Sequence, residues 1–300
     1  MLRGDREIPV RLRLKFRAFF IFGKRLAMPS TTEIKVSSLI RLIGTTGQPA
    51  LLDVRVAEDV AGDPRRLPCA TFHDYRDVAH WAGLYRGQSV VVICQKGKKL
   101  SHGVAAMLRL AGAHAESLAG GLEAWREQGG LLVEPAKLPP ITHEAGSLWV
   151  TRARPKIDRI ACPWLIRRFI DRQARFMFVA PGEVHAVAGH FGATPFDCED
   201  MVWSHRGELC TFDVMVADFG LAHPALDRLA RIVRGADTAR LDLEPEAAGL
   251  LALSIGLSRL YRDDLAQLEA GLLIYDALYR WSRDGSDETH NWPSKGKTGA

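Results

Sequence analysis

A single cysteine, Cys94, stands where its thiol could act as a nucleophile. It directly follows the apolar run 89–93, which is typical of a buried strand, and helical spacing begins again at Ser101. A loop between a strand and a helix can turn its backbone N–H groups toward one anion, and the helix dipole adds to this attraction. We therefore predict a reactive thiolate at Cys94. The spacing leaves open the alternative of a small cysteine buried at the end of a strand.

The residues after Cys94 favour an anion in the same loop. Gly97 permits a sharp turn that residues with a Cβ resist. Lysines on both sides of this glycine would attract a sulfur-bearing anion and stabilise the thiolate. The residues predicted to bind the anion are Gln95, Lys96, Gly97, Lys98 and Lys99.

Strands and helices must alternate to position this loop. The predicted strands cover residues 50–54, 89–93 and 115–118, and the predicted helices cover 36–43, 101–110 and a segment that contains Leu122 and Trp125. This order predicts an α/β domain over residues 32–133, with a parallel sheet and helices on its faces.

A proline-rich segment, 134–146, is predicted to link this domain to a second one over residues 147–283. The second domain is predicted to be mostly α-helical with a few short strands. Its predicted strands cover 147–151 and 176–179, and its predicted helices cover 163–173, 182–191, 211–219, 224–233, 245–257 and 263–281. Pro163 is expected in the first turn of its helix. A polar tail, 284–300, follows.

The composition agrees with two domains and indicates the cellular compartment. The chain has 300 residues, of which 47% are hydrophobic, which is enough for two cores. No apolar run reaches the length of a membrane span. The five cysteines contain no CxxC pair, so we predict no disulfide framework and a reducing, cytoplasmic setting.

The basic charge belongs to the first 27 residues. Segment 1–27 carries eight basic and two acidic residues, a net charge of +6, whereas the other 273 residues sum to −1. The body of the chain therefore gives no strong sign of a nucleic-acid partner. We expect segment 1–27 to be an extension upstream of a true start near Met28, with a basic arm that touches a partner or membrane as the alternative.

Four motifs in order resemble those of the rhodanese family. They are Leu52-Asp53-Val54-Arg55, Pro68-Cys69-Ala70, Val91-Val92-Ile93-Cys94-Gln95-Lys96-Gly97, and Gly120-Gly121-Leu122-Glu123-Ala124-Trp125 with Gly129. The resemblance implies that Cys94 takes sulfane sulfur from thiosulfate or a persulfide and passes it to a thiol or cyanide. It also implies that Arg55 helps to bind the anion, and it implies no cofactor.

The chain departs from the rhodanese pattern at two places. The segment between Arg55 and Pro68 lacks the usual Gly-His-Ile, and Leu100 stands where the loop often has Ser or Thr, with Ser101 one residue later. We expect slow turnover or an unusual donor. Cys69 is expected to be structural, with resolution of a Cys94 persulfide as the alternative.

Polar residues in apolar settings are the candidates in the second domain. They are Asp158, Arg159, His205, Asp213 and Asp237. His205, Asp213 and Asp237 could supply a metal or an acid–base site, but no pair has ligand spacing, so we predict no metal. The alternative is that these residues cap helices and turns, as expected for Asp237 and Asp263.

The segment 149–169 is similar to the opening of the C-terminal domain of ChrB-type chromate-resistance proteins. The similarity continues through Pro195-Phe196-Asp197, His205-Arg206-Gly207, Cys210-Thr211-Phe212-Asp213 and Ile232-Val233-Arg234-Gly235-Ala236-Asp237. Regulators of this type have His-Asp where this chain has Arg234-Gly235, and the change removes a candidate metal ligand.

The leading hypothesis is therefore a sulfurtransferase coupled to chromate resistance. Chromate resembles sulfate in shape and charge, so the loop could admit it, and a thiolate could reduce it. The alternative is a chromate-sensing transcriptional regulator, and a third possibility is an inactive rhodanese fold that serves as a docking surface. The sequence predicts no oligomeric state.

Overall fold

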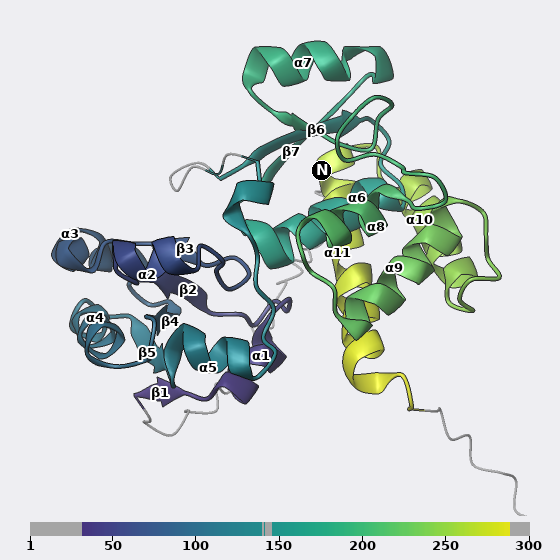
Figure 1. The fold of residues 1–300 in the computed structure, drawn as a ribbon. Helices are drawn as coiled ribbons and strands as arrows, with labels where there is room; N and C mark the ends of the chain where they lie inside the picture. Colours follow the sequence, from purple (N-terminus) through teal and green to yellow (C-terminus); the bar gives the residue numbers. More distant parts are fainter. Residues whose placement is uncertain (1–31, 140, 142–145, 289–300) are drawn as a thin grey trace, which may run out of the picture. The chain divides into compact units, whose positions relative to one another are not determined.

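A five-stranded parallel sheet organises the first half of the chain (Figure 1). The computed structural model describes residues 32–139, 141 and 146–288, so the predictions for segment 1–27 and for most of the tail lie outside the described residues. The strands are β1 (Glu33–Ile34), β2 (Ala50–Asp53), β3 (Thr71–Phe72), β4 (Ser89–Ile93) and β5 (His114–Leu118). Their order, β1-β5-β4-β2-β3, puts β4 in the centre.

Both faces of this sheet are buried, as a parallel sheet requires. Val90 and Val92 of β4 join one hydrophobic cluster, and Val91 and Ile93 join another on the opposite face. The surrounding helices are α1 (Val36–Leu42), α2 (Ala57–Gly62), α3 (Val78–Trp81), α4 (Lys99–Leu110) and α5 (Gly121–Glu127). The predicted α/β class is confirmed.

Helix α4 begins two residues earlier than its apolar spacing predicted. Ser101 lies inside the helix, fully buried, and its hydroxyl donates to the carbonyl of Lys98 at 3.1 Å. A serine whose hydroxyl is satisfied in this way can occupy a first turn. The loop between β4 and α4 therefore contains only residues 94–98, which we call the Cys94 loop.

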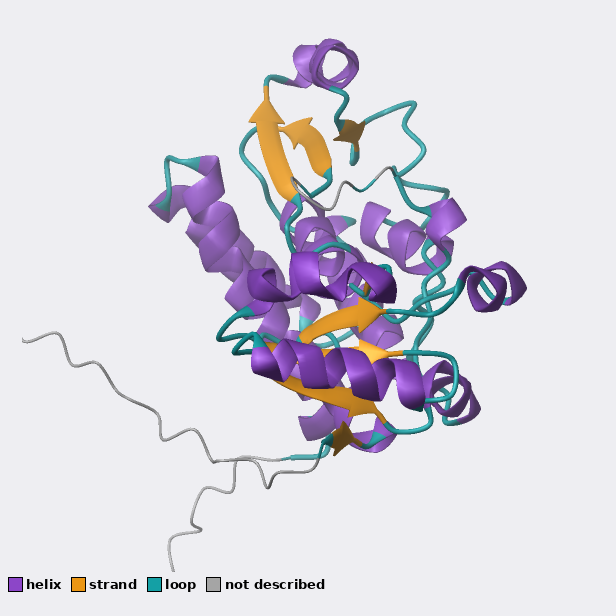
Figure 2. Ribbon diagram, turned by 90° about the vertical axis from the view of Figure 1, so that its left-hand side faces the viewer, coloured by secondary structure: helices purple, strands orange, loops and turns teal. Residues whose placement is uncertain are grey.

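The second half is mostly helical, as predicted, around a three-stranded parallel sheet of order β7-β6-β8. Figure 2 shows its strands as a group separate from the first sheet. The strands are β6 (Leu148–Arg152), β7 (Arg175–Val179) and β8 (Thr194–Pro195). The helices are α6 (Asp158–Leu165), α7 (Val184–Phe191), α8 (Thr211–Asp218), α9 (Pro224–Asp237), α10 (Ala247–Leu260) and α11 (Asp264–Arg280).

Short helical turns connect or extend these elements. Four are 3-10 turns, η1 (Tyr75–Asp77), η2 (Ala82–Tyr85), η3 (Pro135–Lys137) and η5 (Pro181–Glu183), and two are π-helical, η4 (Ile166–Ile170) and η6 (Trp281–Gly285). In the part of the chain that the structure describes, no helix combines the length and apolarity that a membrane span needs.

The prediction that a helix begins at Pro163 is wrong. Pro163 lies inside α6, which starts at Asp158, and a π-helical turn follows from Ile166. Proline lacks the N–H that would bond the carbonyl four residues earlier, which ordinarily disfavours an interior position. Here every residue from Ile160 to Phe169 except Arg167 and Arg168 is buried, so packing maintains the helix.

One hydrophobic cluster continues from the first half of the chain into the second. It includes Val36 and Leu39 of α1 together with Trp149, Trp164 and Phe169. The backbone N–H of Cys69 donates to the carbonyl of Phe169 at 3.0 Å. The predicted linker, of which residues 140 and 142–145 lie outside the described part, is therefore not the only connection between the halves.

Candidate functional site

The Cys94 thiol lies at the carboxyl end of the central strand β4. The backbone N–H of Lys98 donates to Cys94 Sγ at 3.4 Å, and Ser101 Oγ lies 3.2 Å from the same sulfur. Cys94 is 5% exposed. The sulfur is thus mostly shielded from water but touches two hydrogen-bonding groups that can stabilise a thiolate.

The backbone of the Cys94 loop offers further donors. Within the described residues, nothing accepts a hydrogen bond from the backbone N–H groups of Gln95, Lys96 or Gly97. Consecutive N–H groups in a tight loop form a concave site for an anion. The loop can therefore bind an anion at the sulfur without any metal.

Helix α5 fixes the shape of this loop. The N–H groups of Leu122 and Glu123 donate to the carbonyls of Cys94 and Gln95 at 3.0 and 3.1 Å. A Cβ on Gly97, whose φ is +59°, would lie 2.4 Å from the carbonyl oxygen of Leu118. This close contact with Leu118 explains why residue 97 is a glycine. Because the carbonyls of Cys94 and Gln95 accept from α5, they do not bond the N–H groups of the loop, which remain available for an anion.

Two lysines of the Cys94 loop and Lys99, the first residue of α4, are exposed and unpaired. Lys96, Lys98 and Lys99 reach solvent, and none of them forms an ion pair with a described residue. They contribute positive charge to the approach of an anion. Gln95 differs, because its side chain donates to Glu123 at 3.4 Å and is directed to α5.

Arg55 does not have the role that we expected. Its guanidinium is buried, and it binds the Asp53 carboxylate at 2.7 Å and the carbonyls of Asp63 and Arg65 at 2.7 and 3.0 Å. A guanidinium with these partners is not free to hold a substrate anion. The expected anion contact of Arg55 is therefore contradicted: it ties β2 to the segment after α2.

A second group of polar side chains gathers in the second half. His205 Nε2 lies 3.2 Å from Asp237 Oδ2, 3.5 Å from Asp158 Oδ2 and 3.7 Å from Asp197 Oδ1. Asp158 is the first residue of α6 and Asp237 the last residue of α9. Folding thus brings together three of the predicted residues (Asp158, His205 and Asp237), and we call them with Asp197 the carboxylate–histidine cluster.

Burial and mutual charge shift the pKa values of residues in this cluster. The nearby Asp158 carboxylate, assisted by the charges of Asp237 and Asp197, raises the pKa of His205 to about 9. Burial, followed by repulsion from Asp158 and Asp197, raises the pKa of Asp237 to about 7. Burial likewise raises the pKa of Asp197. Negative charge is crowded here, and only one imidazole lies among the carboxylates.

Arg159 and Arg152 form ion pairs with Asp197. Arg159 Nε lies 3.4 Å and Arg152 Nη2 3.1 Å from Asp197 Oδ2. Arg159 also donates to the carbonyl of Ala153 at 3.0 Å. Arg159 thus lies at the edge of the cluster, as a partner of the one acid that was not predicted.

Asp213 lies outside these contacts. Its carboxylate accepts from the N–H of Cys210 at 3.1 Å and from Arg234 Nη1 at 3.1 Å. Asp213 therefore caps α8, as the alternative proposed. Asp237 ends α9 and does not precede a helix, and its carboxylate faces the backbone N–H of Asp158 at the start of α6. Asp263 does cap α11 through the N–H of Ala266 at 2.6 Å.

Both halves match known protein families. Residues 36–128 match the rhodanese-like domain, and residues 149–282 match the C-terminal domain of ChrB. The chain joins a rhodanese-like domain to a ChrB-type C-terminal domain. Protein ChrB of Cupriavidus metallidurans is 35% identical over 140 residues, which make up 46% of this chain and 41% of that protein. The chain thus spans less than half the length of this relative.

Solved structures are similar to about a third of this chain. A rhodanese-like domain protein from Staphylococcus aureus is 21% identical, with 32% of this chain and 91% of that one covered and a TM-score of 0.29. A thiosulfate sulfurtransferase from Pseudomonas aeruginosa is 21% identical, with 35% and 19% covered and a TM-score of 0.29. Since these TM-scores are low, the fold assignment depends on the family match and the observed sheet order.

The remaining cysteines are poorly suited to nucleophilic chemistry. Burial raises the pKa of the Cys69 thiol to about 12, and this thiol lies 3.8 Å from the carbonyl oxygen of Arg167, in the ChrB-type domain. Burial also raises the pKa values of Cys162, Cys198 and Cys210. These contacts favour the structural role that we predicted for Cys69.

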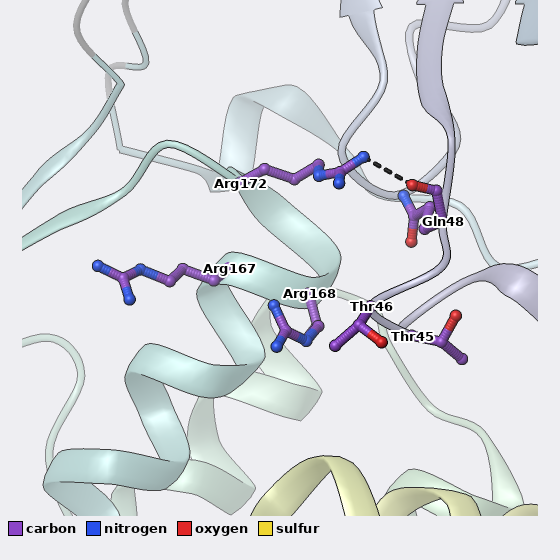
Figure 3. A pocket seen from close by; sticks show the side chains of 6 residues that line it. All are labelled: Thr45, Thr46, Gln48, Arg167, Arg168 and Arg172. Atoms are coloured by element: carbon purple, nitrogen blue, oxygen red, sulfur yellow. Dashed lines mark hydrogen bonds between the residues drawn. The ribbon is translucent and has the colours of Figure 1, made fainter. Parts of the chain in front are cut away.

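A polar recess lies near Cys69, but its arginines are occupied. It is lined by Thr45, Thr46, Gln48, Arg167, Arg168 and Arg172 (Figure 3). Arg172 donates to the carbonyl of Gln48 at 2.8 Å, as the dashed line shows. Arg168 is paired with Asp276 at 2.8 Å, and Arg167 with Glu269. This recess is therefore a weaker candidate for an anion than the Cys94 loop.

Sequence reasoning missed two residues of these sites. Ser101 reaches the sulfur although it is displaced by one position from the usual Ser or Thr, since α4 begins early enough to turn it inward. Asp197 joins the carboxylate–histidine cluster from a loop. The backbone of Asp197 has a φ of +52°, which the sequence does not reveal. The motif Pro195-Phe196-Asp197 was the one sequence feature that could have pointed to this residue.

Proposed function

We propose that the rhodanese-like domain is a sulfurtransferase and that Cys94 carries the transferred sulfur as a persulfide. The observation that supports this most is the surroundings of the sulfur. The Lys98 N–H donates to it at 3.4 Å, and within the described chain the N–H groups of residues 95–97 have no acceptor. Such donors suit a thiolate first and a persulfide afterwards.

Two displacements account for the transfer. The Cys94 thiolate attacks the outer sulfur of thiosulfate, a sulfur–sulfur bond forms, and sulfite leaves with the electron pair of the bond that breaks. A thiolate or cyanide then attacks the outer sulfur of the Cys94 persulfide, which releases the Cys94 thiolate and yields a new persulfide or thiocyanate. No metal, cofactor or external oxidant is needed for either step.

The second part of the proposal is that this chemistry serves chromate resistance. It is supported by the ChrB-type domain in the same chain. Chromate and thiosulfate are both tetrahedral dianions, so the N–H groups and the exposed lysines of the Cys94 loop would attract either. We infer that chromate competes with thiosulfate for this loop.

The test is a thiosulfate:cyanide assay on the whole chain, with and without chromate. We expect turnover by the wild type, inhibition by chromate that excess thiosulfate relieves, and loss of thiocyanate formation in Cys94→Ser. Cys69→Ser is the matched control, since this thiol has a pKa of about 12 and should be dispensable. Equal thiocyanate formation by wild type and Cys94→Ser would mean that Cys94 does not carry the sulfur. No thiocyanate formation by either would mean that the domain acts only as a docking surface.

A further inference from the structure

The carboxylate–histidine cluster contains ligand atoms at metal-binding separations. One ligand atom each from Asp158, His205 and Asp237 lie within 4.8 Å of one another. The three residues come from the start of α6, a loop and the end of α9. Helices and their packing against the core thus hold the two carboxylates, whereas the loop brings the imidazole to them.

Asp158 is a buried carboxylate with an oxygen that has no partner. Its side chain is 1% exposed and lies against His205. The backbone N–H of Thr211 donates to Oδ2 at 2.6 Å, but Oδ1 is buried and has no hydrogen-bond partner among the described residues. A buried acceptor without a partner is costly, and a cation at this position would satisfy it.

Neighbouring cations do not fill this role. Arg152 and Arg159 are directed to Asp197, at 3.1 and 3.4 Å. Arg234, one helical turn before Asp237, is paired with Asp213 at 3.1 Å. Within the described part of the chain, His205 is therefore the one basic side chain that lies within 4.0 Å of both the Asp158 and the Asp237 carboxylates.

We propose that Asp158, His205 and Asp237 bind a divalent first-row transition metal ion. One imidazole nitrogen and two carboxylate oxygens suit Mn²⁺, Fe²⁺ or Zn²⁺. The side chains of His205 and Asp237 are 43% and 20% exposed, so an ion can enter from solvent and keep open positions there. Asp197 Oδ1 lies 3.7 Å from the same imidazole nitrogen and accepts from Thr211 Oγ1 at 2.8 Å, so it adds negative charge beside the ion.

Titration of the whole chain with Mn²⁺, after chelator treatment and removal of the chelator, tests the proposal. Mn²⁺ is preferred as the probe because thiolates, which bind Zn²⁺, are poor ligands for it. Calorimetry and electron paramagnetic resonance should report one ion per chain. His205→Ala and Asp237→Asn should each weaken binding by about tenfold or more.

A matched control separates this site from adventitious binding by surface histidines. His185 lies exposed on α7, and His185→Ala should bind Mn²⁺ as the wild type does. Circular dichroism shows whether His205→Ala is folded; this side chain is partly exposed on a loop, so the fold should survive. Equal affinity and stoichiometry in wild type and His205→Ala, or no binding of Mn²⁺ by the wild type at millimolar concentration, would overturn the proposal.

Discussion

Hydrogen bonds around Cys94 explain how a mostly buried sulfur could carry charge. In the thiol form, the S–H donates to Ser101 Oγ, and the Ser101 hydroxyl donates to the carbonyl of Lys98. When the thiolate forms, a rotation of the Ser101 hydroxyl lets it donate to the sulfur instead. The Lys98 N–H donates to the sulfur without any rotation. The charged sulfur thus accepts from two donors, Lys98 N–H and the Ser101 hydroxyl, whereas the thiol accepts from Lys98 N–H alone.

Ser101→Ala should therefore slow sulfur transfer by about 10–100-fold, because a hydrogen bond to a charged group contributes about 1.5–3 kcal/mol. The smaller side chain fits the fully buried position, so the fold should be preserved. Thiocyanate formation from thiosulfate and cyanide is the measurement. Ser89→Ala, at an exposed position of β4, is the control. Wild-type turnover in Ser101→Ala would show that the hydroxyl does not assist the thiolate.

At the scale of elements, the site is a contact between the Cys94 loop and the start of α5. Gly121, at φ +60°, begins this helix directly beneath the loop. A Cβ there would lie 2.2 Å from the carbonyl oxygen of Cys94 and 2.4 Å from the N of Gly97. The Gly120-Gly121 motif after β5 therefore affects sulfur transfer indirectly. Because it has no side chains, it leaves room for the backbone of the Cys94 loop.

Gly121→Ala should destabilise the rhodanese-like domain by about 1–3 kcal/mol and abolish sulfur transfer, since the loop must move to admit a methyl group and the residue must keep a positive φ. Denaturant unfolding and the thiocyanate assay together measure this. Gly83→Ala is the control, because nothing lies within 4 Å of a Cβ at Gly83. Normal activity in Gly121→Ala would mean that the loop does not depend on this close contact.

At the scale of the whole molecule, the two domains share a hydrophobic core. Phe169, fully buried in the ChrB-type domain, lies where a Cβ on Gly44 would meet its ring at 2.4 Å. Leu39 and Leu51 of the rhodanese-like domain belong to the same cluster as Trp164. A shared core means that the stability of each domain depends on the other.

Phe169→Ala should therefore cost about 3–5 kcal/mol and lower the stability of both domains together. Calorimetry should show a single unfolding transition that shifts as a whole, and sulfur transfer should be lost at the same lower temperature. Leu260→Ala, at a position 73% exposed on α10, should change neither. If only one of two transitions moves, while sulfur transfer keeps its thermal profile, the domains are energetically independent.

The sequence by itself determined the elements whose signals are local. The apolar run of β4 was predicted to the residue, because a strand buried on both faces must be continuously apolar. The order of four motifs indicated the rhodanese-like domain. The apolar run of β4 and the motif that follows it together placed Cys94 at the end of this strand. The helical character of the second domain was also predicted, since each helix has its own apolar spacing.

Only the tertiary structure decided which polar groups meet. Arg55 was assigned to the anion, but its partners are the neighbouring Asp53 and two carbonyls that folding buries beside it. Asp158, His205 and Asp237 share no spacing pattern, because they lie on different elements and come together only when α6 and α9 pack. Contacts between elements distant in sequence leave no periodic trace, so the sequence offered Asp158, His205 and Asp237 as separate candidates and only the fold joined them into one cluster.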